Sequence, residues 1–245
     1  MEFTTFNIIQ LLLVASLIIF GIYYLYTEFF GRNYEPLIWK NLLLQGKVDK
    51  ELFKASKKYP DKDRFFNFWF QVERLKQTNI KGAFAELGVY KGVTANILHL
   101  MDTEREFHLF DTFEGFTEKD LKDETGKAAT YTTHNFADTS IDQVSKLLSS
   151  SKFVFHKGYF PQTTQDIEQI KYALVSMDAD LYNPTLAGLE YFYPLMEKGG
   201  LILIHDHNPD WPGIMQAVRE FSTTIPEPFI QLTDKDSTVM LLKSF

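Results

Sequence analysis

Residues 173–206 read ALVSMDADLYNPTLAGLEYFYPLMEKGGLILIHD, and this stretch decides the fold. The apolar runs at 173–178 and 200–206 have the length and composition of buried strands, and a helix-like segment near 184–196 joins them. A strand, a crossover helix and a second strand build a parallel sheet covered on both faces. Ligands bind beyond the carboxyl ends of such strands, and both runs end in polar side chains here.

The same alternation extends outward from this unit. Further strands are predicted at 83–88, 106–111 and 152–158, and further helices near 92–101, 140–149 and 212–224. A last pair of strands, near 229–232 and 238–242, has no helix between its members, which predicts an antiparallel final strand. Residues 78–245 are therefore predicted to form one α/β domain with a Rossmann-like, mostly parallel sheet.

Composition narrows the chemistry. The 245 residues carry 32 acidic and 25 basic side chains, a net charge of −7, which argues against a nucleic-acid partner. The chain has no cysteine, so disulfides, thiolate metal sites and cysteine nucleophiles are excluded. Any bound metal must use oxygen or nitrogen ligands.

Residues 8–26, IIQLLLVASLIIFGIYYLY, contain no charged side chain. As a helix they would reach about 28 Å, enough to cross a bilayer. The closing aromatics resemble an interfacial belt; they are Tyr23, Tyr24, Tyr26, Phe29 and Phe30. A cleavable signal peptide would have a basic start, a shorter apolar run and a small-residue cleavage site. Residues 1–30 are predicted to be a membrane anchor, with a buried core helix as the alternative.

The basic residues beside this segment predict its orientation. Arg32, Lys40 and Lys47 follow it and none precedes it, which places the C-terminal bulk of a single-pass protein in the cytoplasm. Amphipathic helices follow at 37–45, 50–59 and 64–76. They predict a helical cap or linker over residues 31–77.

A glycine turn follows the first strand of the sheet. It reads ELGVYKGVT, with Glu86 before Gly88 and Gly92, and it leads into a helix whose N-terminus favours an anionic group. The spacing is not the GxGxxG of a dinucleotide site. Asp111 ends the second strand, where a carboxylate can hold a ribose diol or, alternatively, cap the next segment.

The fourth and fifth strands end in hard metal ligands. Asp178 and Asp180 follow one, and His205, Asp206, His207 and Asn208 follow the other. Neighbouring strand ends would bring these groups within reach of one divalent cation of the Mg or Mn type. The alternative is that Asp178 caps a helix and the histidines are ordinary loop residues.

Together these motifs resemble class I S-adenosylmethionine-dependent methyltransferases, specifically the metal-dependent sugar O-methyltransferases of the macrocin O-methyltransferase type. The resemblance covers about residues 78–243. It is carried, in order, by AELGVYKGVTA, LFDTFEGF, NFADTS, KGYFPQT, MDADLYNPTLAGLEYFYPLMEKGGLILIHDH and PGIMQAVREF. The glycine turn is also similar to that of catechol-type O-methyltransferases.

The resemblance implies a role for each matching residue. Those expected around the methionine part of S-adenosylmethionine are Glu86, Gly88, Tyr90, Gly92 and Thr94. Asp111 would hold the ribose, and Asp138 and Ser140 would lie on the adenine side. Asp178 and Asp206 would bind the metal, and Asp180 would be the general base. His205 stands where relatives have an aspartate, so the third ligand is His205 or His207, and the metal is Mg²⁺, Mn²⁺ or Fe²⁺.

The expected acceptor is a hydroxyl of a sugar or lipid-linked sugar, since an anchor concentrates the enzyme near lipid-linked substrates. Self-association into a homo-oligomer stays open. Two other functions fit the residues less well. A membrane-anchored glycosyltransferase would use DAD at 178–180 as its metal motif, and a non-catalytic scaffold would keep the methyltransferase fold alone.

Overall fold

The computed structural model describes residues 4–27, 35–165, 167–168 and 170–244. The chain forms two units, residues 1–47 and 48–245. This division does not coincide with the predicted boundaries after residues 30 and 77. The helices of 48–77 belong to the same unit as the sheet.

The first unit contains α1 (Thr5–Tyr26) and α2 (Leu37–Leu44). α1 confirms the helix predicted over 8–26 and starts slightly earlier, where the Thr4 hydroxyl accepts a hydrogen bond from the backbone of Asn7. Over an 18-residue window of α1 the mean hydropathy reaches 2.4, and none of these residues is buried. By length and composition, α1 is able to cross a membrane. Phe29, Phe30 and Arg32 lie outside the described residues.

The second unit is built on a seven-stranded sheet of order β3-β2-β1-β4-β5-β7-β6. The strands are β1 (Ala83–Leu87), β2 (Phe107–Asp111), β3 (Phe153–Lys157), β4 (Tyr172–Met177), β5 (Met196–Ile204), β6 (Phe229–Gln231) and β7 (Val239–Leu242). β1 to β5 pair in parallel, and β7 runs antiparallel to both β5 and β6. The predicted mostly parallel sheet with an antiparallel last strand is confirmed.

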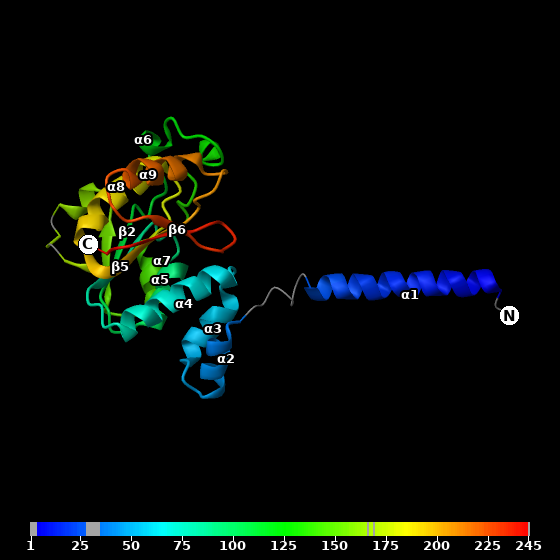
Figure 1. The fold of residues 1–245 in the computed structure, drawn as a ribbon. Coiled ribbons are helices and arrows are strands. Elements are labelled where there is room, and N and C mark those ends of the chain that lie inside the picture. The colour runs from blue at the N-terminus through cyan, green and yellow to red at the C-terminus, as the bar shows by residue number, and fades with distance from the viewer. Residues whose placement is uncertain (1–3, 28–34, 166, 169, 245) are drawn as a thin grey trace. The chain divides into compact units, whose positions relative to one another are not determined.

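Helices cover both faces of this sheet (Figure 1). α8 (Tyr182–Phe192) and α9 (Pro212–Ser222) pack together on one face. α4 (Lys62–Gln77), α5 (Val93–Met101) and α7 (Ile141–Leu148) cover the other, and α3 (Lys50–Lys58) packs on α5. The short α6 (Glu118–Leu121) lies in the long connection between β2 and α7.

Two neighbouring boundaries differ from the prediction. The helix expected over 184–196 ends at Phe192, and a single 3₁₀ turn over Tyr193–Leu195 precedes β5. Pro194 has no backbone N–H to donate to the carbonyl four residues earlier, so the α-helical hydrogen bonds end here although Tyr193 keeps helical torsions. β5 therefore starts at Met196 rather than at residue 200.

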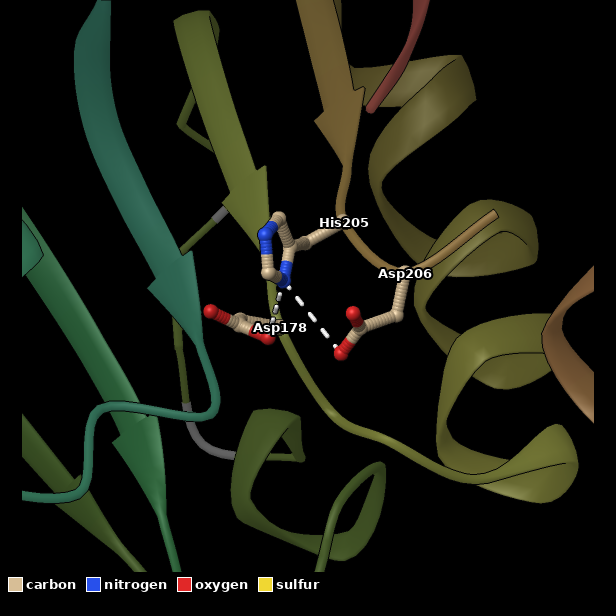
Figure 2. A group of neighbouring side chains, drawn as sticks. All are labelled: Asp178, His205 and Asp206. Carbon is tan, nitrogen blue, oxygen red and sulfur yellow. Dashed lines mark hydrogen bonds and ion pairs between the residues drawn. The ribbon is translucent and has the colours of Figure 1, made fainter. Parts of the chain in front are cut away.

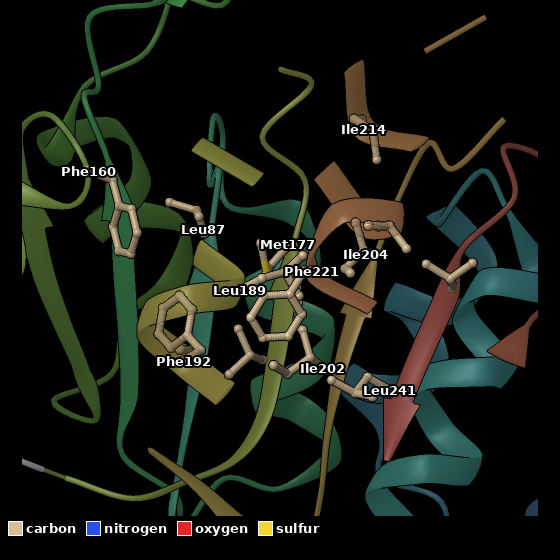
Figure 3. Close-up of a cluster of buried hydrophobic side chains, with 14 of the residues drawn as sticks. Leu87, Phe160, Met177, Leu189, Phe192, Ile202, Ile204, Ile214, Phe221 and Leu241 are labelled. Atoms are coloured by element: carbon tan, nitrogen blue, oxygen red, sulfur yellow. The ribbon is translucent and has the colours of Figure 1, made fainter. Parts of the chain in front are cut away.

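The core between the sheet and α8–α9 fixes where the strands end. Its side chains include Leu87, Met177, Leu189, Phe192 and Ile204, which Figure 3 shows meeting from β1, β4, α8 and β5. Every residue of β4 is buried. A close-packed core of this kind tolerates little displacement, so the residues after β4 and β5 are held in fixed positions.

α4 covers the opposite face and starts beside the same strand ends. Asp61 caps it, with Oδ1 accepting from the Arg64 backbone N–H at 2.9 Å. The other oxygen of Asp61 accepts from the backbone N–H of Lys235, in the β6–β7 loop, at 3.0 Å. The start of α4 is thereby tied to a loop that lines the cavity described next.

Candidate active site

A cavity of about 560 Å³ opens beyond the carboxyl ends of the parallel strands. Most of the residues predicted to form the site line it: Glu86, Gly88, Tyr90, Thr94, Asp111, Asp178, Asp180, His205 and Asp206. Gly92, Asp138 and Ser140 are not among its lining residues. The parallel sheet thus brings together side chains from four separate strand ends, as the sequence predicts.

The glycine turn is shaped by contact with the end of β4. Gly88 has φ +85°, and a Cβ placed on it would lie 2.0 Å from the carbonyl oxygen of Asp178. Only glycine fits this position. Gly92, with φ +75°, is the N-cap of α5, so the turn delivers the free N–H groups of α5 next to the cavity.

Glu86 is the most deeply buried acid of the cavity, with 1% of its surface exposed. Among the described residues, none provides a hydrogen-bond partner for its Oε2. Desolvation raises the pKa of Glu86 well above its ordinary value, and Asp178 raises it further, while Arg64 opposes the shift. A buried orphaned carboxyl oxygen at a cavity wall fits a ligand that brings a cationic or N–H group.

Asp111 binds the glycine turn. Its Oδ2 accepts from the backbone N–H groups of Val89 and Tyr90 at 2.7 and 2.8 Å, and its Oδ1 accepts from that of Phe113 at 2.6 Å. The Thr112 hydroxyl adds a long contact to Oδ1 at 3.5 Å, so all of the roughly four lone-pair directions of this carboxylate have a partner in the chain. The capping alternative is therefore realised in the structure, and the ribose role of Asp111 stays a prediction.

The two residues expected on the adenine side have other partners. Asp138 is exposed and accepts from the Tyr90 hydroxyl at 2.7 Å and from Lys91 Nζ at 2.6 Å. Ser140 is the N-cap of α7 and accepts from the backbone of Gln143. Neither contact points to a nucleoside, and their cofactor role stays a prediction.

Asp178, His205 and Asp206 converge, as Figure 2 shows. Asp178 follows β4 and His205 and Asp206 follow the adjacent β5. The imidazole Nδ1 lies 3.2 Å from Asp178 Oδ1 and 3.3 Å from Asp206 Oδ2. One donor atom from each residue lies within 4.8 Å of the other two.

The choice between the two histidines follows from this geometry. His205 lies between the two carboxylates, whereas the Nδ1 of His207 lies 3.3 Å from Oε1 of Gln231, in β6. Successive side chains alternate between sides of an extended chain, and 205 and 207 are separated by Asp206, whose left-handed φ of +60° breaks that alternation. His205 is the histidine that the structure groups with the acids.

Electrostatics couple the three residues. Desolvation by itself lowers the pKa of His205, but Asp178 and Asp206 raise it to about 10. Desolvation by itself raises the pKa of Asp178, but His205 and Arg64 bring it well below its ordinary value. The positive charges of the His205 imidazolium and the Arg64 guanidinium thus offset the negative charges of the carboxylates.

Asp180 lies at the same strand end but outside this three-residue group. It adopts φ +60° and lines the cavity. Desolvation raises its pKa well above the ordinary value, and the neighbouring Asp178 and Asp206 raise it further. A carboxyl with a raised pKa is suited to accept a proton from a bound hydroxyl, provided that a nearby positive charge keeps it ionised beforehand.

The sequence did not identify two contributors to the site. Arg64, from the first turn of α4, donates from Nη2 to Oδ2 of Asp178 at 2.9 Å. Tyr59, at the end of α3, lies with its hydroxyl 3.3 Å from that of Thr94. Both belong to the segment expected to be a cap or linker, and no motif marks them, because an arginine in an amphipathic helix normally faces solvent.

Three aromatic side chains line the cavity, two from the β2–α7 connection and one from the start of α9. Phe116 stacks on Tyr131 with centroids 5.3 Å apart, and Tyr131 contacts Trp211, at the N-cap of α9, with centroids 5.5 Å apart. All three residues line the cavity. These rings offer a stacking surface in the same cavity as the acidic strand ends.

The site therefore fits both of the predicted ligands by its chemistry. S-adenosylmethionine carries a sulfonium and an ammonium charge, and the cavity holds the acids Glu86, Asp178 and Asp180 with an orphaned oxygen on the first. A divalent cation prefers carboxylate oxygens and imidazole nitrogen, which Asp178, Asp206 and His205 supply.

Comparison with known protein families shows to which family the chain belongs. The family model of macrocin O-methyltransferases (TylF) matches residues 56–240. The chain belongs to this family. The matched region includes α4 with Arg64, so the macrocin O-methyltransferase unit begins well before the predicted residue 78.

Two curated proteins are similar to this chain. A methyltransferase of Streptomyces olivaceus, named as an 8-demethyl-8-(2,3-dimethoxy-alpha-L-rhamnosyl)-tetracenomycin-C 4'-O-methyltransferase, is 24% identical over 60% of this chain and 61% of its own length. A mycinamicin III 3''-O-methyltransferase of Micromonospora griseorubida is 27% identical over 64% of this chain and 67% of its own. The match spans about three fifths to two thirds of these relatives.

Solved structures share the fold. The O-methyltransferase NovP has a TM-score of 0.63 at 24% identity, covering 75% of this chain and 81% of its own. The calicheamicin methyltransferase CalS11 has a TM-score of 0.60 at 19% identity, covering 99% of this chain and 94% of its own. The predicted class I methyltransferase fold is confirmed.

Proposed function

We propose that this protein transfers a methyl group from S-adenosylmethionine to a hydroxyl of a sugar or glycoconjugate, with the help of a divalent cation and from a membrane-anchored position. The observation that carries the proposal is the convergence of Asp178, His205 and Asp206 beside a cavity bounded by the Gly88 turn. Membership of the macrocin O-methyltransferase family supports the reaction class. The curated relatives are named as O-methyltransferases, and the name of one includes a rhamnosyl group.

The donor, when bound, supplies an already activated methyl group, so the chain mainly has to align the acceptor and make its oxygen nucleophilic. Glu86 provides a buried oxygen for the donor's amino acid part, and Gly88 allows it to approach the backbone. Tyr90 and Thr94 line the same cavity. These residues bind and orient the donor.

Asp178, Asp206 and His205 would hold the cation, which supplies Lewis-acid polarisation of the acceptor oxygen. Mg²⁺ and Mn²⁺ both suit this set of ligands, and the imidazole shifts the preference toward Mn²⁺ or Fe²⁺. Asp180 lies next to this group and accepts the proton of the acceptor hydroxyl as the methyl group moves. The rings of Tyr131 and Trp211 exclude water and offer a face to the sugar.

The N-terminal helix suggests where the acceptor is found. α1 spans about 33 Å at 1.5 Å per residue, the thickness of a hydrocarbon core. An anchored enzyme meets lipid-linked sugars at a raised effective concentration. We expect the catalytic unit on the cytoplasmic side, because the basic residues near α1 follow it.

Binding and turnover test the proposal on the full chain in lipid nanodiscs. Calorimetric titration should show saturable binding of S-adenosylhomocysteine and of Mn²⁺. Asp178→Ala and Asp206→Ala should abolish turnover and Mn²⁺ binding while leaving S-adenosylhomocysteine binding nearly intact, and Asp180→Asn should reduce turnover alone. Full turnover in either alanine variant would remove the metal role.

The acceptor is identified by mass spectrometry of membrane lipids and polysaccharides from cells with and without the protein, as a gain of one methyl mass. A metal-dependent glycosyltransferase is the second candidate because of DAD at 178–180. Saturable binding of UDP without any response to S-adenosylhomocysteine would favour it. Wild-type protein that binds the donor product but methylates nothing would favour a scaffold.

A further inference from the structure

α2 exposes an apolar surface to solvent. Leu37, Ile38 and Leu44 are exposed by 72%, 50% and 88%. Leu37 and Leu44 lie seven residues apart, which places them on the same side of the helix. Soluble surfaces tolerate single exposed leucines, but three on a helix of eight residues form a patch that indicates an interaction site.

Within residues 36–48 the charged side chains are lysines, and Glu35 and Asp49 flank this segment. Its sequence is PLIWKNLLLQGKV, with Lys40 and Lys47 and no acidic residue. Exposed leucines combined with lysines are typical of helices that lie in the interface of an anionic bilayer. A second copy of the chain fits less well, because the same lysines would face each other across a two-fold axis.

Chain length keeps α2 near the proposed span. α1 ends at Tyr26 and α2 begins at Leu37. Even a fully extended connection of this length reaches no further than about 40 Å. If α1 crosses the bilayer, α2 is confined to the neighbourhood of its surface.

We propose that α2 is an interfacial helix that inserts Leu37, Ile38 and Leu44 into the headgroup region of a bilayer containing anionic phospholipids, with Lys40 and Lys47 at the phosphates. The chain then meets the membrane at two places, the span and α2. This inference rests on the proposed anchoring by α1.

The absence of cysteine allows a direct test. Nitroxide labels are attached to single-cysteine variants of the full chain, Leu44→Cys, Leu17→Cys and Leu147→Cys, in vesicles of phosphatidylcholine and phosphatidylglycerol. Leu17 reports on α1. Leu147 is the matched control, an exposed leucine next to a lysine on α7, another helix of eight residues. Electron paramagnetic resonance measures label collisions with oxygen and with a water-soluble nickel complex.

We expect a several-fold higher ratio of oxygen to nickel collisions at Leu44 than at Leu147, and a still higher ratio at Leu17. The ratio at Leu44 should fall toward that of Leu147 in Lys40→Gln/Lys47→Gln. A Leu44 label as accessible to nickel as Leu147, with Leu17 in lipid, overturns this inference and leaves the anchor in place. A Leu44 label shielded from both reagents indicates a protein contact and also overturns it. A Leu17 label in water overturns the anchor itself.

Discussion

Arg64 donates a hydrogen bond from Nη2 to Oδ2 of Asp178 at 2.9 Å, across 114 positions of sequence. The two side chains are only 10% and 26% exposed. The contact occupies one oxygen of Asp178 and leaves Oδ1 facing His205. α4 thus contributes to the candidate active site, because its arginine orients a proposed metal ligand.

Arg64→Met should lower the free energy of unfolding by about 3 kcal/mol or more, because it leaves His205 as the cation that offsets both Asp178 and Asp206 in a largely buried place. Urea denaturation measures the loss. Asp178→Asn introduced together with Arg64→Met should recover part of it, since the amide carries no charge. Lys54→Met is the control, because it removes an exposed ion pair with Glu51 and should change the free energy of unfolding far less. Equal losses of unfolding free energy in Arg64→Met and Lys54→Met would show that the buried pair stabilises the fold no more than an exposed pair does.

Gly88→Ala should be among the most harmful substitutions in the chain. The new methyl group would lie 2.0 Å from the Asp178 carbonyl oxygen, so β1 and β4 must separate where the cavity begins. We expect a loss of about 4 kcal/mol or more in unfolding free energy, together with loss of S-adenosylhomocysteine binding. Gly92→Ala is the matched control at a similar φ, with a movable Val144 methyl group 2.8 Å away, and should cost about 1–2 kcal/mol. A Gly88→Ala protein as stable as Gly92→Ala would contradict the geometry.

Asp111→Asn and Asp138→Ala should differ in their effect on S-adenosylhomocysteine binding, because Asp111 holds the glycine turn and Asp138 is exposed outside the cavity lining. Asp111 accepts three backbone hydrogen bonds, and an amide cannot replace both oxygens, so the turn at Val89 and Tyr90 should loosen. We expect S-adenosylhomocysteine binding to weaken by about tenfold or more, measured by calorimetry. Asp138 is exposed, and its removal should weaken binding by less than about fivefold. A larger loss at Asp138 than at Asp111 would instead support the predicted adenine role of Asp138.

The strand ends were predictable from the sequence because of a simple geometric rule. Parallel strands bring their carboxyl ends to one edge, so Asp178 and Asp206 had to be neighbours once their strands were recognised. The choice between His205 and His207 was not predictable, because it depends on the left-handed backbone at Asp206. Local torsions of this kind leave no periodic signal.

Contacts made by residues outside the βα units could not be predicted from the sequence either. Arg64 lies in RFFNFWFQVERLK, where the helical pattern predicts which face is buried but not what lies against it. The family resemblance adds roles that no local pattern predicts, and at Asp138 and Ser140 such a role stays a prediction. It carried a cofactor role to two residues that the structure places on Tyr90 and on the first turn of α7.

A histidine pair on the sheet gives the fold its own acid sensitivity. Nδ1 of His108, in β2, lies 2.8 Å from Nε2 of His156, in β3, and Nε2 of His108 lies 2.8 Å from Oε1 of Glu106. An ionised carboxylate only accepts, so a neutral His108 donates from Nε2 and accepts at Nδ1 from Nε2 of His156. The contact between the two rings cannot form when both imidazoles are protonated, because two N–H donors would then face each other.

Desolvation lowers the pKa of both histidines, and for His156 to about 4 from an unfolded value of 6.5, with His108 adding to the effect. Between pH 6.5 and about 4, the unfolded chain therefore binds more protons than the folded chain. The contribution of His156 to the free energy of unfolding is fully present above pH 6.5 and is lost as the pH decreases toward 4. His156→Gln keeps an N–H donor for His108 and cannot titrate. Urea denaturation across this range should show a shallower decline for His156→Gln than for the wild-type protein. Parallel curves would assign the acid sensitivity to other groups, because a non-titrating side chain at 156 removes this contribution whatever its effect on stability at neutral pH.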